Sequence, residues 1–253
     1  MELEGISQEV LRQVRARLNA EERVAPKADL FVADVPRKLE HSLLNPDTTV
    51  KQILEGCAIA KEFGIASLCV APYHVATAAE QLYGTRTAVG SAVGFPHGCI
   101  STAAKVAEIR ECTTRGATEL DVAINVLAVK SGDLAGAKRD LLECVNAAYG
   151  RAKVKAVFEH KLFTDDEKKA VLEMIASSGA EFIKVQNVLS GHGARVEELQ
   201  LVRSVCGDAV RIKIDGGVKT LEKAAELFAA GADRIGLTAT ASICKEALAC
   251  SRF

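Results

Sequence analysis

The sequence predicts a (β/α)8 barrel, a closed ring of eight parallel strands in which each strand is followed by a helix. Three observations favour this fold. The chain has 253 residues, close to the usual barrel size of about 250. Short apolar runs alternate with amphipathic helical stretches, and helices that end in glycine recur at regular intervals. A doubly wound open sheet is the alternative, but eight evenly spaced units suit the barrel better.

The repeated unit is a helical stretch that ends in glycine, continues through a small residue and enters an apolar run. It occurs at Gly64, Gly116, Gly179 and Gly231. Successive copies are therefore separated by roughly two strand–helix units. Each glycine fits the left-handed conformation that ends a helix. The unit therefore predicts where four helices stop and four strands begin.

The elements follow in order along the chain. An extra helix is expected over about residues 5–23, before the barrel. Eight β-rich runs are expected as strands, at 35–41, 67–70, 88–95, 119–124, 154–160, 181–185, 210–215 and 233–237. Helical periodicity fills the gaps, most clearly at 48–63, 102–115, 134–149 and 220–230. No Pro-, Gly- or Ser-rich linker divides the chain, so residues 1–253 are expected to form one domain, with the barrel over about 35–250.

Composition and charge argue against several classes of protein. Lys and Arg number 32 against 33 Asp and Glu, and only 4% of residues are aromatic, so the basic surface and stacking rings of a nucleic-acid-binding protein are not expected. The eight cysteines form no CxxC pair, so no metal site is expected. No apolar run is long enough to cross a membrane. The N-terminal segment has no secretory apolar region, which favours a cytoplasmic protein.

Two lysines stand out at the strand ends, where barrels carry their functional side chains. Lys184 lies in EFIKV and Lys213 in RIKID, in apolar surroundings that exclude a lysine unless it has a partner. If both point into the barrel, burial and mutual repulsion should lower the pKa of each and produce a neutral amine. Such an amine forms a Schiff base with a carbonyl compound, and Asp121 would carry the protons. A structural, salt-bridged lysine is the alternative at each position.

Two glycine-rich turns follow the last two strands and fit a phosphate site. One contains Gly216 and Gly217 after Asp215, and the other contains Gly236 and Thr238. Backbone N–H groups in such turns and at helix N-termini bind phosphate dianions. Other polar residues at predicted strand ends are Glu40, His41, Asn125, Glu159 and His160.

Seven segments, in the right order, resemble deoxyribose-phosphate aldolase, a family of class I aldolases. They lie at 39–49, 69–75, 93–98, 119–133, 181–184, 212–220 and 231–236. The resemblance implies that Lys184 forms the Schiff base, that Lys213 tunes it and that Asp121 transfers protons. It also implies reversible cleavage of 2-deoxy-D-ribose 5-phosphate to acetaldehyde and glyceraldehyde 3-phosphate, without a metal or other cofactor. Members of the family are often dimers, so a homodimer is expected.

The chain departs from the family in the substrate pocket. After Lys184 the family usually reads Thr-Ser-Thr-Gly, whereas this chain reads Val185-Gln186-Asn187-Val188. Asp215 stands where the family has a small residue, and Glu40 replaces the usual Asp. At about 5 Å and an effective dielectric near 20, an extra carboxylate repels each unit of phosphate charge by about 3 kcal/mol, roughly a hundredfold in affinity. Contacts to the substrate or its phosphate are expected from Glu40, Asn187, Gly216, Gly217, Gly236 and Thr238.

Two other functions fit the same residues. A relative with little or no turnover of that substrate would have an altered pocket beside an intact lysine pair, and would act as a protein-binding or regulatory module instead. Alternatively, the lysine chemistry serves a different, unphosphorylated aldehyde, and Val185, Val188 and Asp215 set its specificity. The expected ligand remains a small phosphorylated sugar or aldehyde.

Overall fold

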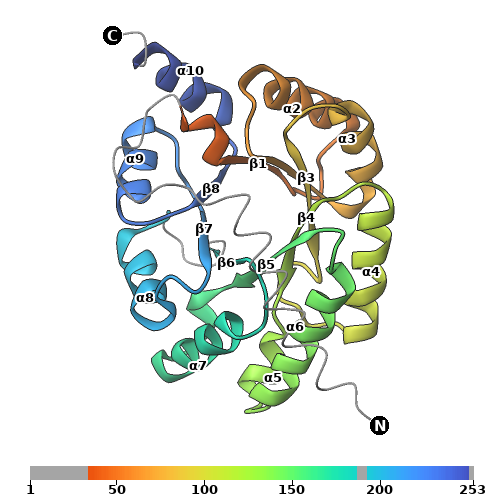
Figure 1. The fold of residues 1–253 in the computed structure, drawn as a ribbon, viewed down its shortest axis with the longest axis vertical. Helices are drawn as coiled ribbons and strands as arrows, with labels where there is room; N and C mark the ends of the chain where they lie inside the picture. Colours follow the sequence, from red (N-terminus) through yellow and green to blue (C-terminus); the bar gives the residue numbers. More distant parts are fainter. Residues whose placement is uncertain (1–33, 187–192, 251–253) are drawn as a thin grey trace. The chain divides into compact units, whose positions relative to one another are not determined.

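The computed structural model describes residues 34–186 and 193–250, and these contain a closed barrel of eight parallel strands. Each strand pairs with the next along the chain, and β1 pairs with β8, with Leu39 opposite Ile235, which closes the ring. The helices lie around the outside of the strands (Figure 1). The predicted (β/α)8 barrel is confirmed. The strands are β1 Leu39–Leu43, β2 Ser67–Val70, β3 Ala88–Val93, β4 Glu119–Ala123, β5 Lys153–Phe158, β6 Phe182–Val185, β7 Arg211–Asp215 and β8 Arg234–Leu237.

Helices connect the strands as the amphipathic stretches predicted. They are α2 Val50–Phe63, α3 Val75–Leu82, α4 Thr102–Thr114, α5 Val126–Lys130, α6 Leu134–Ala148, α7 Asp165–Ala176, α8 Val196–Cys206, α9 Leu221–Ala229 and α10 Thr240–Cys250. Three short 3-10 helices accompany them: η2 Pro36–Lys38, η3 Pro72–His74 and η4 His160–Leu162. The helix expected over 5–23 lies outside the described residues. Within the described part of the chain, no helix is both long and apolar enough to span a bilayer.

The glycines of the repeated unit adopt the conformation that their positions predict. Gly64 ends α2 with φ 62°, and Gly116, Gly179 and Gly231 have φ values of 106°, 95° and 103°. A residue with a Cβ rarely adopts such angles, so glycine is favoured where the chain leaves a helix and turns into the next strand.

The first strand begins later than the sequence predicts. Residues 36–38 form a 3-10 turn, with Pro36 at its start and Lys38 N donating to Val35 O at 2.9 Å. Proline has no N–H to give to a strand ladder, and its fixed φ suits the first position of a helical turn. The strand therefore starts at Leu39, and its end still carries the polar residues expected there.

Alternation along the strands separates the apolar core from a charged interior. In β6 and β7 the fully buried Ile183, Ile212 and Ile214 alternate with Lys184 and Lys213. Successive side chains of a strand point to opposite faces. The isoleucines therefore pack under the surrounding helices, and the two lysines point into the barrel.

Candidate active site

Three residues predicted to act together meet inside the barrel. Asp121, on β4, accepts hydrogen bonds through Oδ2 from Lys184 Nζ at 2.8 Å and from Lys213 Nζ at 2.9 Å. All three side chains are buried. Lys184 pairs in register with Lys213 between β6 and β7, which places the two lysines side by side. A single carboxylate oxygen therefore holds both ammonium groups.

Glu40, on β1, binds the lysines from another side of the barrel. Its two oxygens each accept from Lys155 Nζ at 2.8 Å, and Oε2 also accepts from Lys213 Nζ at 2.7 Å. The side chain is fully buried. This placement differs from the substrate contact expected of Glu40, because its oxygens are already bonded to ammonium groups. Glu40 instead anchors Lys213, so that Lys213 bridges Glu40 and Asp121.

The charged groups of this cluster stabilise one another. Burial by itself would lower the pKa of Lys184, but the carboxylates of Asp121 and Asp215 outweigh burial and raise it. At Lys213 the carboxylates of Asp121, Asp215 and Glu40 likewise outweigh burial and raise the pKa well above its usual value. Burial would raise the pKa of Glu40, but the neighbouring ammonium groups hold it at about 2. Lys213 does lower the pKa of Lys184, as predicted, but the predicted net lowering at the two lysines is wrong for the free protein, because each faces more carboxylates than ammonium groups.

Sequence reasoning missed three further charged residues of the cluster. Lys155 of β5 is fully buried, and its Nζ lies 2.5 Å from Glu119 Oε2 on β4. Arg234 of β8 lies 3.5 Å from Glu40 Oε1 and 3.7 Å from Glu119 Oε1. Two signals could have found them. Lys155 is flanked by apolar residues like the two predicted lysines, and Glu119 stands two residues before Asp121, hence on the same face of its strand.

Asp215 is a second carboxylate beside Lys184, the lysine that the resemblance predicts to form the Schiff base. Asp215 Oδ2 lies 2.8 Å from Lys184 Nζ, and Oδ1 lies 3.8 Å from Lys213 Nζ. Its side chain is 17% exposed, whereas that of Asp121 is 2% exposed. The carboxylate also fills the space over Gly236, where an added Cβ would come within 1.8 Å of Oδ1. Glycine at position 236 therefore leaves room for the carboxylate in this position.

The residues predicted to bind phosphate lie next to this carboxylate. Gly216 and Gly217 follow Asp215 directly, with φ values of 125° and 62°. Gly236 is the register partner of Asp215 between β7 and β8. Thr238 follows β8 and is exposed. The structure thus brings three of the predicted glycines to one edge of the barrel, around Asp215. Asn187, also predicted to bind substrate, lies outside the described residues.

Other polar residues at the strand ends are hydrogen-bonded to partners outside the lysine cluster. Asn125 caps α5, because its Oδ1 accepts from Ala128 N at 3.1 Å. His41 Nδ1 lies 2.8 Å from Thr240 Oγ1, at the start of α10. Glu159 Oε2 accepts from Gln186 Nε2 at 3.3 Å, and burial raises the pKa of this carboxyl group. The contact of Asn125 stabilises the start of α5, and that of His41 joins β1 to α10.

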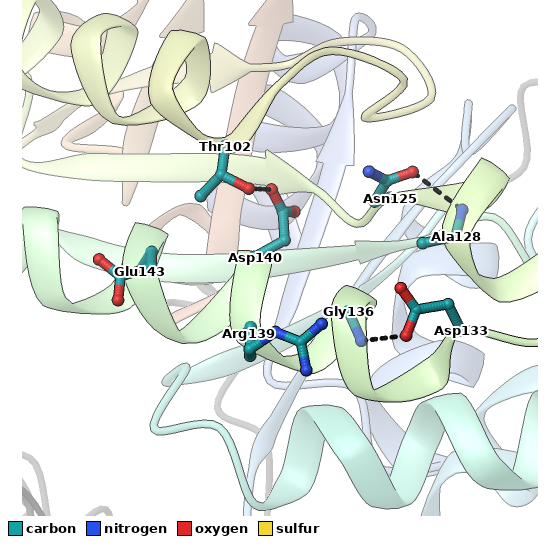
Figure 2. A pocket seen from close by; sticks show the side chains of 8 residues that line it. All are labelled: Thr102, Asn125, Ala128, Asp133, Gly136, Arg139, Asp140 and Glu143. Carbon is teal, nitrogen blue, oxygen red and sulfur yellow. Dashed lines mark hydrogen bonds between the residues drawn. The ribbon is translucent and has the colours of Figure 1, made fainter. Parts of the chain in front are cut away.

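A separate pocket of about 440 Å³ lies outside the barrel, beside α4, α5 and α6 (Figure 2). Next to it, the fully buried Lys105 donates to Asp140 Oδ2 at 2.6 Å and to Ala123 O at 2.9 Å. Thr102 Oγ1 donates to Asp140 Oδ1 at 2.8 Å. None of the residues predicted for catalysis or substrate binding lines this pocket. The lining residues are Thr102, Asn125, Ala128, Asp133, Gly136, Arg139, Asp140 and Glu143.

Comparison with known proteins gives a consistent result. The model of the DeoC/LacD family of aldolases matches residues 23–246. A deoxyribose-phosphate aldolase of Bacillus cereus (strain AH820) is 38% identical over 210 residues, which are 83% of this chain and 94% of that protein. Among solved structures, "QR15, an Aldolase" is similar with a TM-score of 0.80 and 33% identity, covering 85% of this chain and 96% of that one. A putative deoxyribose-phosphate aldolase from Coccidioides immitis has a TM-score of 0.81 and 29% identity, covering 96% and 98%.

Proposed function

The chain belongs to the DeoC/LacD family of aldolases, and on this premise we propose that it is a class I aldolase that works through a Schiff base on Lys184. Its proposed reaction is the reversible cleavage of 2-deoxy-D-ribose 5-phosphate to acetaldehyde and glyceraldehyde 3-phosphate. The observation that carries the proposal is the shared carboxylate: Asp121 Oδ2 is bonded to both Lys184 Nζ and Lys213 Nζ.

The reaction starts with a proton leaving Lys184. Because the pKa of Lys184 is raised, this step is uphill in the free protein. The carboxylates in direct contact with the ammonium group are Asp121, by a hydrogen bond, and Asp215, by an ion pair. The neutral amine then attacks the aldehyde carbon and forms a carbinolamine. Loss of water gives an iminium ion, whose positive charge replaces that of the ammonium group between the same two carboxylates.

The iminium ion then accepts electrons from the bond that breaks. When a base removes the proton of the 3-hydroxyl group, the C2–C3 bond cleaves, glyceraldehyde 3-phosphate leaves and an enamine remains on Lys184. Protonation of C2 and hydrolysis release acetaldehyde and restore the amine. Asp121 is placed to carry these protons. Lys213, held between Asp121 and Glu40, keeps Asp121 ionised and in position. The iminium serves as the electron sink, so this chemistry uses no metal or other cofactor.

Chemical trapping tests the proposal. The protein is incubated with acetaldehyde and sodium borohydride, digested and analysed by mass spectrometry. The expected product is an N-ethyl group on Lys184. Lys105 and Lys155, which are also fully buried, should stay unmodified and serve as internal controls. An adduct on another lysine would overturn the role of Lys184. No adduct, together with no cleavage of millimolar 2-deoxy-D-ribose 5-phosphate, would favour the protein-binding alternative. The homodimer stays a prediction, to be measured by the mass of the protein in solution.

A further inference from the structure

Asp215 occupies a position from which one carboxylate reaches both the lysine pair and the glycine turns. It stands at the end of β7, with Oδ2 at 2.8 Å from Lys184 Nζ and Oδ1 at 3.8 Å from Lys213 Nζ. Gly216 and Gly217 follow it, and its Oδ1 lies where a Cβ of Gly236 would be. A ligand group that enters between these turns and Lys184 therefore meets the carboxylate.

The carboxylate of Asp215 also balances the charge of the barrel interior. The ion pairs of the described residues link four acidic side chains to four basic ones. The acidic residues are Glu40, Glu119, Asp121 and Asp215, and the basic residues are Lys155, Lys184, Lys213 and Arg234. Without Asp215 the cluster would carry one surplus positive charge at the edge where the glycine turns lie. With Asp215 these eight side chains are formally neutral, so the surplus charge that would attract an anion is removed.

Hydrogen bonding reinforces the effect of charge. A phosphate ester at neutral pH carries close to two negative charges and presents mainly acceptor oxygens. An ionised carboxylate is also only an acceptor, so the two groups repel each other without a compensating hydrogen bond. A terminal hydroxyl group can instead donate to a carboxylate oxygen, and each such oxygen accepts more than one hydrogen bond.

From this geometry we propose that Asp215 is a specificity-determining residue that reduces the advantage of phosphate esters over the corresponding uncharged, hydroxyl-terminated aldehydes. The inference rests on the proposed aldolase function at Lys184. It concerns the end of the substrate remote from the carbonyl carbon. At about 5 Å and an effective dielectric near 20, the carboxylate weakens binding of each unit of phosphate charge roughly a hundredfold, and the nearby ammonium groups reduce this figure.

The ratio of kcat/KM for 2-deoxy-D-ribose 5-phosphate to that for 2-deoxy-D-ribose is the measurement that tests the inference. It is compared between the wild-type protein, Asp215→Asn and Asp215→Ser. Asp215→Asn keeps the size of the side chain and removes the charge. The ratio should rise about 10- to 100-fold in both variants. An effect of charge alone predicts a similar rise in both, whereas a rise in Asp215→Ser only would show that Asp215 acts by its size and would overturn the inference.

Two controls separate the possible failures. If wild-type Lys184 is trapped by acetaldehyde and the ratio changes less than threefold in both variants, the specificity role is wrong and the proposed function stands. If no aldehyde is trapped on Lys184, the proposed function fails and this inference fails with it. Inorganic phosphate provides a test on the wild-type protein that needs no variant to fold. It should inhibit cleavage of 2-deoxy-D-ribose only at concentrations of tens of millimolar or more, and inhibition at micromolar phosphate would overturn the inference.

Discussion

Two regions of this molecule bury lysines beside carboxylates, and they do so in different ways. Lys105, on α4, has one carboxylate partner, Asp140, and one carbonyl partner, Ala123 O. The other oxygen of Asp140 is bonded to Thr102 (Figure 2). Inside the barrel, by contrast, Asp121 Oδ2 is shared by Lys184 and Lys213. Lys184 in turn has a second carboxylate, Asp215, within 2.8 Å.

The difference shows that burial of a lysine does not by itself indicate catalysis. At Lys105 each carboxylate oxygen has its own donor, so the pair stabilises two packed helices, α4 and α6, and offers no second position for a proton. In the barrel, two lysines and two carboxylates are in direct contact. A proton can move from one group to another there with little movement of heavy atoms, which is what formation and hydrolysis of a Schiff base require.

The largest effect expected from this comparison is on activity. Lys184→Met should lower kcat/KM for aldol cleavage more than about a thousandfold, because it removes the nucleophile. Lys105→Met, the matched substitution at the other buried lysine, should change kcat/KM less than about threefold at a temperature where the variant is folded. Coupled assay of both purified variants measures this. Equal losses of activity in the two would contradict the distinction between the regions.

The next effect concerns stability. Lys105→Met leaves the Asp140 carboxylate buried beside an apolar side chain and should cost about 3 to 5 kcal/mol of unfolding free energy. The double variant Lys105→Met/Asp140→Leu removes both charges and should recover most of that loss. Urea denaturation followed by circular dichroism measures both. If the double variant is less stable than Lys105→Met alone, the ion pair contributes more than the removal of an unpaired charge, and the account of this region needs revision.

The smallest effect is a dependence of stability on pH, which should distinguish the barrel interior from the region around Lys105. The pKa of Glu40 is about 2 in the folded protein, below its usual 4.5. The unfolded chain therefore binds a proton first as the pH falls, and the stabilisation is complete above pH 4.5 and is lost as the pH falls towards 2. Its size is about 3 kcal/mol, from a shift of roughly 2.5 units.

Glu40→Gln should accordingly flatten the fall in unfolding free energy between pH 5 and pH 2. Glu80→Gln, at an exposed position of α3, should leave the slope as it is in the wild type. Denaturation curves at a series of pH values supply the slopes. An unchanged slope in Glu40→Gln would show that the ion pairs of Glu40 do not contribute to stability in this way.

Much of the fold follows from local patterns in the sequence. The glycines at 64, 116, 179 and 231 have positive φ, and the apolar runs that follow them form strands, because helix ends and strand alternation are set by neighbouring residues. Pro36 delays the first strand for an equally local reason. In contrast, the pairing of β1 with β8 depends on residues about 200 positions apart, and the sequence predicts it only through the choice of a closed fold.

The site was less predictable because its electrostatics depend on contacts between distant strands. Lys184, Lys213 and Asp121 carry visible signals, since charged residues in buried strands need partners. The direction of their pKa shifts has no such signal in the sequence, because it depends on how many carboxylates face each lysine. Glu40 illustrates the limit: its position at a strand end indicates function, but its contacts with Lys155 and Lys213 follow only from the closed barrel.

The close approach of Gly236 to Asp215 restricts how the site could have changed during evolution. A Cβ at position 236 would come within 1.8 Å of Asp215 Oδ1, so alanine at 236 would displace the Asp215 carboxylate from its present position. Glycine at position 236 thus allows Asp215 to keep its contact with Lys184. Conversely, a side chain at position 236 fits without moving the carboxylate when residue 215 is shorter than aspartate. The two sites are therefore expected to show epistasis, because a substitution of Gly236 also disturbs the contact of Asp215 with the lysine pair.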